Sequence, residues 1–208
     1  ELGMTTDKNG EIMDTQASYA APLNFNCVSD ENLKAANARL SVLAQDPNQS
    51  SNGAGVVQGN SGPGGSSGQK LDCPAYSITT GFNATPNILP ALTRGGNIDD
   101  AYNMFTCTEY ASWLYPVTKG ATTMWERWNS YELAFQMNGN SAMNSFNHFA
   151  LGAVGSWMYE YQMGITTDHA NGDAGYQDFV LQPLAGGIYT GLEGSYESNY
   201  GTIESDWT

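Results

Sequence analysis

The chain has 208 residues and carries 21 acidic against 7 basic side chains, which gives a formal net charge of −14 at pH 7. This length fits one or two domains and can bury a sizeable core. Because nucleic acids and anionic membrane surfaces bind basic proteins, so acidic a chain is expected to bind neither.

Composition also bears on where the protein works. Lys and Arg are scarce, Gly and Tyr are plentiful, and no apolar run is long enough to span a bilayer. The triplets Asn-Gln-Ser at 48–50 and Asn-Ala-Thr at 83–85 match the pattern of N-glycosylation acceptors, and the first falls in a predicted loop. We therefore expect a secreted protein that can carry a glycan at Asn48 if its host is a eukaryote.

Two helices are predicted in the first 45 residues. Residues 11–26 have spaced apolar positions, and Pro22 is expected to kink or end this helix. Residues 30–44 give a clearer pattern, with Leu and Ala recurring on one face and Asp30 able to cap the amino end.

The composition shifts at residues 46–76, which we interpret as a flexible surface insertion. Residues 46–70 hold almost no large apolar side chains and are rich in Gly, Ser and Asn. Their glycines do not follow the GxxxxGK[ST] pattern of a phosphate-binding loop, and no predicted strand leads into them.

The three cysteines, Cys27, Cys73 and Cys107, lie far apart and lack the spacing of metal ligands. Either they are buried or idle thiols, or Cys27 and Cys73 form a disulfide that staples the insertion and leaves Cys107 unpaired. The disulfide suits a secreted protein. The two histidines show no paired spacing, so neither a metal nor another cofactor is expected.

Further helices are predicted after the insertion. Residues 78–93 begin extended and continue as a short helix after Pro86. Residues 98–109 form another helix after a Gly-Gly break. Residues 143–163 give the clearest helical pattern of the chain, in which Gly152 and Gly155 are expected to allow close helix approach.

After about residue 168 the apolar period changes from 3.6 to 2. Strands are predicted in residues 176–187, 188–198 and 200–207. The order of helices and then strands predicts a mainly α domain over residues 1–168 and the start of a β domain over residues 169–208. A solvated sheet face, rather than a calcium site, is indicated by the alternating acidic residues Glu193, Glu197, Glu204 and Asp206.

The stretch GATTMWERWNSY, residues 120–131, sets the carboxylate of Glu126 between Trp125 and Trp128, with Arg127 beside it. Tryptophan faces can stack on a pyranose ring, and an apolar surround makes a carboxylate a better base near neutral pH. A sugar-handling site and a structural ion pair of Glu126 under a tryptophan lid both remain open. Groups nearby that could bind hydroxyls are Asn129, Asn144, Asn147 and His148.

His148 also has two interpretations. It lies on an otherwise apolar predicted helix, where a lone histidine can be a hydrogen-bonded core residue. It can equally be a partner for a hydroxyl or carboxylate in a pocket.

Four long segments carry a family resemblance. They are LYPVTKGATTMWERWNSY, MNSFNHFALGAVGSWMYEYQMGI, GYQDFVLQPLAGG and SYESNYGTIESDW, with shorter upstream matches in DTQASYA, TTGFNATPNILPAL and TEYASWLYP. Together they resemble the bacterial and fungal α-L-rhamnosidases of glycoside hydrolase family 78. The resemblance covers nearly the whole chain outside the insertion.

This resemblance implies the later half of an (α/α)6 barrel followed by the first strands of a C-terminal β-sandwich. It also implies hydrolysis of terminal α-L-rhamnosyl residues with inversion. Glu126, in the W-E-R-W motif, is then the general base, and His148, in the N-S-F-N-H motif, lines the sugar pocket. The other residues expected to bind the carbohydrate are Trp125, Trp128, Phe82 and Trp113 as stacking groups, with Thr80 and Asn147. A pocket role for Phe82 makes a glycan on Asn83 awkward.

The general acid of the family lies in an upstream R-D-E-R-x-G-W-like motif, which this sequence lacks. We therefore expect the chain to be the later part of a longer or cleaved enzyme, whose upstream barrel half supplies the acid. Two alternatives stay open: a non-catalytic fragment that binds rhamnose or another deoxy sugar, and a different glycosidase on the same scaffold.

Overall fold

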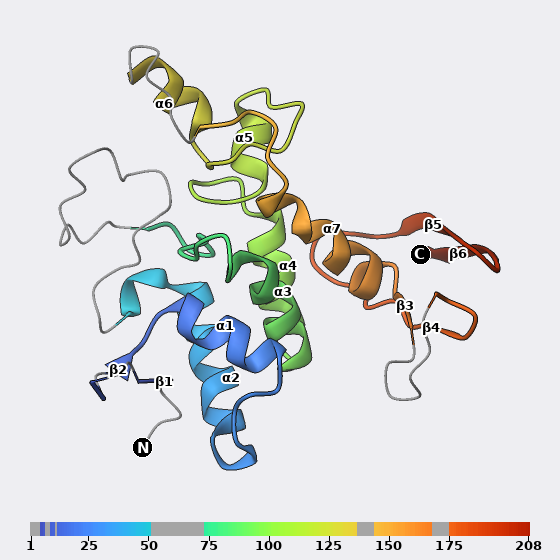
Figure 1. The fold of residues 1–208 in the computed structure, drawn as a ribbon, viewed down its shortest axis with the longest axis horizontal. Coiled ribbons are helices and arrows are strands. Elements are labelled where there is room, and N and C mark those ends of the chain that lie inside the picture. The colour runs from blue at the N-terminus through green and yellow to red at the C-terminus, as the bar shows by residue number, and fades with distance from the viewer. Residues whose placement is uncertain (1–4, 7–8, 11, 51–72, 137–143, 168–174) are drawn as a thin grey trace. The chain divides into compact units, whose positions relative to one another are not determined.

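The computed structural model describes residues 5–6, 9–10, 12–50, 73–136, 144–167 and 175–208. The chain divides into two compact units, Glu1–Gly152 and Ala153–Thr208 (Figure 1). The first unit is mainly helical, and the second contains antiparallel strand pairs after a short helical segment. Most of the predicted insertion, and the predicted domain boundary between residues 168 and 169, lie outside the described residues.

The helical unit opens with a short strand pair, β1 (Thr5–Thr6) and β2 (Ile12–Met13). Its helices follow as α1 (Gln16–Asn24), α2 (Asp30–Gln45), the 3-10 helix η1 (Pro47–Gln49), α3 (Thr85–Arg94), α4 (Ile98–Thr106), α5 (Leu114–Thr118) and α6 (Ser130–Gln136). The first four predicted helices are thus confirmed as α1, α2, α3 and α4, with ends that differ by a few residues.

Side-chain chemistry explains where α1 and α2 begin. The Ser18 N–H donates to Thr15 Oγ1 at 3.2 Å, and the Thr15 N–H donates to Ser18 Oγ at 3.1 Å, which together form a capping box. Pro22 lies inside α1, which ends two residues later. In α2, Asp30 is the first helical residue and not the cap, because Ser29 holds the capping position.

Helix α3 is the most buried element of the helical unit. It packs against α1, α2 and α4, and α2 also contacts α1 and α4 (Figure 1). Eight of the ten α3 residues are buried, as expected of a helix surrounded by others. The largest fully buried side chains of the core include Tyr19, Leu40, Leu43, Ile88, Leu92 and Tyr102. Within the described residues, no helix is long and apolar enough to cross a membrane.

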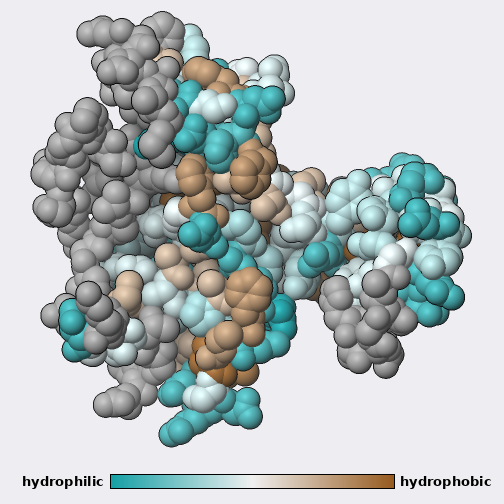
Figure 2. Space-filling model, in the orientation of Figure 1, coloured by the Kyte–Doolittle hydropathy of each residue, from teal (hydrophilic) through white to brown (hydrophobic). Residues whose placement is uncertain are grey.

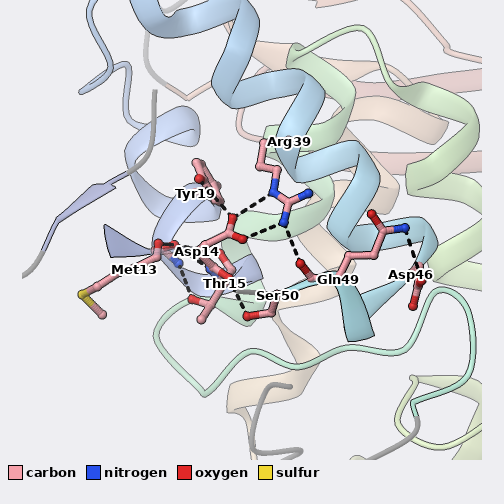
Figure 3. Close-up of polar contacts among 9 residues, drawn as sticks. Met13, Asp14, Thr15, Tyr19, Arg39, Asp46, Gln49 and Ser50 are labelled. Atoms are coloured by element: carbon pink, nitrogen blue, oxygen red, sulfur yellow. Dashed lines mark hydrogen bonds and ion pairs between the residues drawn. The ribbon is translucent and has the colours of Figure 1, made fainter. Parts of the chain in front are cut away.

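A buried ion pair ties the start of α1 to α2. Asp14 is fully buried, and its carboxylate accepts hydrogen bonds from Arg39 Nε at 2.9 Å and Arg39 Nη2 at 2.6 Å (Figure 3). Arg39 Nη2 also donates to the Gln49 carbonyl at 2.7 Å. The Tyr19 hydroxyl donates to Asp14 at 3.3 Å. Burial raises the pKa of Tyr19 to about 12, and the Asp14 charge adds to the rise.

The side chain of Asn48 joins the two described stretches that flank residues 51–72. Its Oδ1 accepts from the Cys73 N–H at 2.9 Å, and its Nδ2 donates to the Cys73 carbonyl at 2.8 Å. We call these two bonds the Asn48 clasp. Nδ2 also donates to Asp46 at 3.1 Å. An N-linked glycan on Asn48 would therefore replace one of the two N–H donors that these bonds use.

The predicted helix over residues 143–163 is confirmed only in part, because helical turns occupy residues 150–162 and not 144–149. The chain has no helix from 144 to 149 and then forms the 3-10 helix η2 (Ala150–Ala153), one α-turn, α7 (Val154–Trp157), and a π-helix, η3 (Met158–Gln162). The Ser145 hydroxyl donates to the Asn147 carbonyl and accepts from the Asn147 N–H, both at 3.1 Å, and such local bonds compete with a helix.

The expectation that Gly152 and Gly155 allow close helix approach is wrong. A Cβ at Gly155 would meet no atom of the described residues within 4 Å. At Gly152 it would lie 3.7 Å from Met124, which is an ordinary van der Waals contact. Neither glycine is therefore required by close packing.

The disulfide considered between Cys27 and Cys73 is not formed. Cys27 is an exposed thiol whose sulfur lies 3.5 Å from the Phe25 carbonyl oxygen, whereas Cys73 is buried. Burial raises the pKa of the Cys107 thiol. The alternative of separate thiols therefore describes the structure.

The second unit is organised around two antiparallel strand pairs, β3 (Ile165–Thr167) with β4 (Phe179–Leu181), and β5 (Leu192–Ser198) with β6 (Gly201–Trp207). The three predicted strand regions are confirmed, and β3 is an additional strand.

Buried apolar side chains of Met163, Ile165 and Ile203 form the core of this unit. The Ser205 hydroxyl donates to the Met163 carbonyl at 2.6 Å and helps to hold β6 on that core. The alternating acidic residues of β5 and β6 are exposed, as a solvated sheet face requires.

Candidate functional site

Two motifs that are separate in sequence lie side by side in the helical unit. The W-E-R-W segment lies between α5 and α6, and the N-S-F-N-H segment precedes η2. The His148 N–H donates to the Met124 carbonyl at 2.8 Å, and the Glu126 N–H donates to the Ser145 carbonyl at 2.9 Å. Main-chain bonds therefore bring Glu126 and His148 into one neighbourhood.

The Glu126 carboxyl group is held by the main chain of the second motif. Its side chain is 6% exposed, and Oε2 accepts a hydrogen bond from the Ser145 N–H at 2.7 Å. A charge-assisted bond of this kind fixes an ionised carboxylate. Glu126 is thus oriented by the Ser145 N–H. Its Oε1 is left to accept a proton from water or a ligand.

Two phenylalanine rings stack on the ring of His148. Phe82 stacks on it with ring centroids 5.1 Å apart and planes 20° apart, and Phe149 stacks at 5.1 Å and 14°. The Ala150 N–H donates to Nδ1 at 3.2 Å. The segment that precedes α3 therefore reaches the same site as the two motifs.

The three predicted stacking tryptophans are buried and pack on other aromatic rings. Trp113, Trp125 and Trp128 are 6%, 5% and 0% exposed. Trp113 meets Trp128 edge-on at 5.8 Å, and Trp125 stacks on Tyr131 at 6.3 Å. Their role in sugar stacking stays a prediction, and the structure shows them as an aromatic layer around the Glu126 segment.

Thr80 and Asn147 differ in exposure. Thr80 is 1% exposed and shares a 2.8 Å hydrogen bond with the Thr85 hydroxyl. Asn147 is exposed, and its main chain closes the local turn with Ser145. Asn147 can therefore reach a ligand without rearrangement, whereas Thr80 would first give up its bond to Thr85.

Exposed aromatic side chains near Glu126 were missed by sequence reasoning. Tyr131, Phe146 and Phe149 are 48%, 41% and 86% exposed. Phe146 packs edge-on against Trp125 at 5.5 Å. Figure 2 shows apolar patches scattered among polar side chains on one face of the helical unit. The N-S-F-N-H motif contains Phe146 and is followed directly by Phe149, but a phenylalanine in a sequence is usually a core residue.

A second carboxylate near the site, that of Glu132, already accepts a hydrogen bond. The Tyr115 hydroxyl donates to Glu132 Oε1 at 2.7 Å. Burial, together with this bond, raises the pKa of Tyr115 to about 12, so the phenol remains a neutral donor. Among the described residues, no group of three or more His, Cys, Asp or Glu side chains is placed to hold a metal ion.

Two family models match this chain. The model of the bacterial α-L-rhamnosidase six-hairpin glycosidase domain matches residues 65–162, and that of the bacterial α-L-rhamnosidase C-terminal domain matches residues 164–208. The chain belongs to the α-L-rhamnosidase family. Every residue predicted above to act on substrate lies inside the match to the six-hairpin rhamnosidase domain.

Individual rhamnosidases agree with this assignment. An α-L-rhamnosidase of Streptomyces avermitilis is 36% identical over 196 residues, which are 93% of this chain and 16% of that protein. The crystal structure of the Streptomyces avermitilis α-L-rhamnosidase complexed with L-rhamnose gives a TM-score of 0.71 at 34% identity, over 97% of this chain and 17% of that one.

The crystal structure of native α-L-rhamnosidase from Aspergillus terreus gives a TM-score of 0.72 at 28% identity, over 97% of this chain and 20% of that one. This chain therefore spans 16% to 20% of the length of these rhamnosidases.

Proposed function

We propose that this chain is the part of an inverting α-L-rhamnosidase that carries the general base, Glu126. The observation that carries the proposal is the anchoring of the buried Glu126 carboxylate by the Ser145 N–H, inside the stretch that matches the rhamnosidase model. One oxygen is fixed and the other can accept a proton from water, which is what a general base requires. The substrate is a glycoside or polysaccharide with a terminal α-L-rhamnosyl residue.

The general acid is proposed to come from a barrel segment of the same protein outside this chain, because the family's acid motif is absent from this sequence. In an inverting hydrolase the two carboxyl groups stand about 6.5–9.5 Å apart, which leaves room for water between base and sugar. In this arrangement the helical unit belongs to the later half of an (α/α)6 barrel, and the strand pairs begin a β-sandwich. The packed helices α1–α4 and the two antiparallel pairs support this arrangement.

His148 and Phe82 are proposed to face the sugar. They stack on one another next to the Glu126 segment, and the aromatic side chains around Glu126 shield its carboxylate from most of the bulk solvent. Trp113 and Trp125 then act through the edges that remain exposed, whereas the fully buried Trp128 packs on Trp113. Asn147 supplies a polar group at the solvent side.

The test is hydrolysis of an aryl α-L-rhamnoside by the full-length protein and its Glu126→Gln variant. Removing a general base is expected to lower kcat by about 10²–10⁴-fold. The matched control is Glu132→Gln, which keeps an acceptor oxygen for Tyr115 and is expected to retain most of the rate. A Glu126→Gln variant that also retains most of the rate would refute the assignment of the base.

Stereochemistry tests the mechanism separately. If the enzyme inverts, nuclear magnetic resonance should detect β-L-rhamnose as the first product of an α-rhamnoside, and initial release of the α-anomer would exclude inversion. Rhamnose binding without turnover would favour the non-catalytic sugar-binding alternative. Turnover of a different aryl glycoside in preference to the rhamnoside would favour another glycosidase on this scaffold.

A further inference from the structure

His148 is constrained at more points than sugar contact alone requires. Its main-chain N–H donates to the Met124 carbonyl at 2.8 Å, and the rings of Phe82 and Phe149 each stack nearly parallel to the imidazole, with ring centroids 5.1 Å away. These contacts leave open which of the two imidazole nitrogens carries the proton. That choice decides what the ring can offer to a ligand.

The Ala150 N–H settles which nitrogen is protonated. It points at His148 Nδ1 with a nitrogen–nitrogen distance of 3.2 Å. A main-chain N–H can only donate, so Nδ1 must accept through its lone pair and cannot carry a hydrogen. In a neutral imidazole the proton then sits on Nε2.

We propose that Ala150 is a positioning residue that holds His148 as the neutral Nε2–H tautomer, so that the ring presents one hydrogen-bond donor to a sugar oxygen. The inference rests on the proposed function, because it specifies how the sugar is recognised at the same site. The opposite tautomer and the imidazolium would both set a hydrogen on Nδ1 against the Ala150 hydrogen. His148 therefore recognises a lone pair on a hydroxyl or ring oxygen, and does not accept a proton from a sugar hydroxyl.

Two substitutions at His148 distinguish the roles of the two ring nitrogens. In His148→Gln the side-chain amide can place an N–H donor near the position of Nε2. In His148→Asn the amide oxygen can accept from the Ala150 N–H near the position of Nδ1, but no donor reaches Nε2. The asparagine variant keeps the local turn and loses the ligand donor, and the glutamine variant does the reverse.

The probe is L-rhamnose, whose affinity for the full-length protein is measured by calorimetry. Loss of one hydrogen bond to a ligand lowers affinity by roughly 2–10-fold. We expect that loss in His148→Asn and a markedly smaller one in His148→Gln. Equal losses, or better binding by His148→Asn, would overturn the tautomer assignment.

A double-mutant cycle tests Ala150 itself. Proline lacks the N–H and is tolerated at the first position of a helix, which is where Ala150 lies in η2. We expect Ala150→Pro to weaken rhamnose binding when residue 148 is His, but to have no further effect in the His148→Gln background, which makes no use of that N–H. Ala150→Gly, which keeps the N–H, is the matched control. An equal loss in both backgrounds would mean a purely structural effect and would overturn the proposal.

The outcomes distinguish this inference from the function on which it rests. A parent protein that does not bind L-rhamnose overturns both. If the parent binds L-rhamnose but the affinity losses of the variants do not depend on an N–H donor at the Nε2 position, the tautomer assignment is overturned. Glu126 then remains the proposed base.

Discussion

Removal of the Arg39 side chain should selectively loosen the start of the helical unit. In Arg39→Ala the fully buried Asp14 carboxylate loses hydrogen bonds of 2.9 and 2.6 Å and keeps the weaker 3.3 Å bond from Tyr19 among those shown in Figure 3. The Gln49 carbonyl loses its donor as well. The substitution therefore leaves a buried negative charge without its cation.

The magnitude follows from the burial of the two partners. Breaking a buried ion pair from one side costs about 3–5 kcal/mol. Arg39 is 24% exposed, so water can partly replace it, and the expected cost lies near the lower limit, about 3 kcal/mol. Because 1.4 kcal/mol is a factor of ten, amide hydrogens of α1 and α2 that exchange through local opening should exchange about a hundredfold faster.

Hydrogen exchange read by mass spectrometry measures this effect in the full-length protein. The matched control is Lys34→Ala, an exposed residue of the same helix, for which a change within about 0.5 kcal/mol is expected. Replacing both partners, as Asp14→Leu with Arg39→Met, should restore much of the protection, because no charge is then buried alone. Equal exchange rates in Arg39→Ala and Lys34→Ala would refute the reasoning.

Three further predictions follow from burial and contacts. Because the pKa of Tyr19 is raised from its ordinary 10 to about 12, its contribution to stability is complete below pH 10 and is lost as the pH rises towards 12. Urea unfolding should show a smaller loss over this range in Tyr19→Phe than in the parent, and the loss that remains comes from other tyrosines with a raised pKa, such as Tyr115; equal losses would contradict this. Trp113→Phe should lower the free energy of unfolding by about 1 kcal/mol more than Trp128→Phe does in the same assay, and equal losses would contradict this. The reason is that Trp113 Nε1 donates to a main-chain carbonyl at 2.9 Å, whereas Trp128 Nε1 has no partner among the described residues. Gly164→Ala should destabilise the second unit by more than about 1 kcal/mol, because Gly164 has a φ of +68° and a Cβ there would overlap the backbone of residues 182–183. Unchanged hydrogen-exchange rates of the β3 amides would contradict this.

The parts of the fold that could be predicted are those in which one apolar period dominates. Helix α2 and the β5–β6 pair follow their patterns closely, because each buries one face. The region 143–163 has helical spacing but contains the N-S-F-N-H motif, whose Ser145 side chain bonds to nearby main chain in place of a helical turn. Periodicity could not reveal that competition, since it counts apolar positions and not local polar bonds.

The candidate site shows a similar division. The resemblance of the motifs pointed to Glu126 and His148, and the structure brings their segments together. It could not show that the N–H groups of Ser145 and Ala150 hold those side chains, because every residue except proline offers the same main-chain donor. The burial of Trp128 likewise depends on packing that residue types do not specify.

The Asn48 clasp has a consequence for how this chain can be varied. By joining residues 48 and 73, it fixes both ends of the intervening chain to the helical unit, whatever that chain contains. The entropy of closing such a loop grows only logarithmically, so each doubling of its length costs about 0.6 kcal/mol. Changes in the length of this stretch should therefore cost little free energy of unfolding, and an engineer could insert a foreign domain between Ser50 and Cys73 while keeping the contacts of Gln49 and Ser50 with the helical unit.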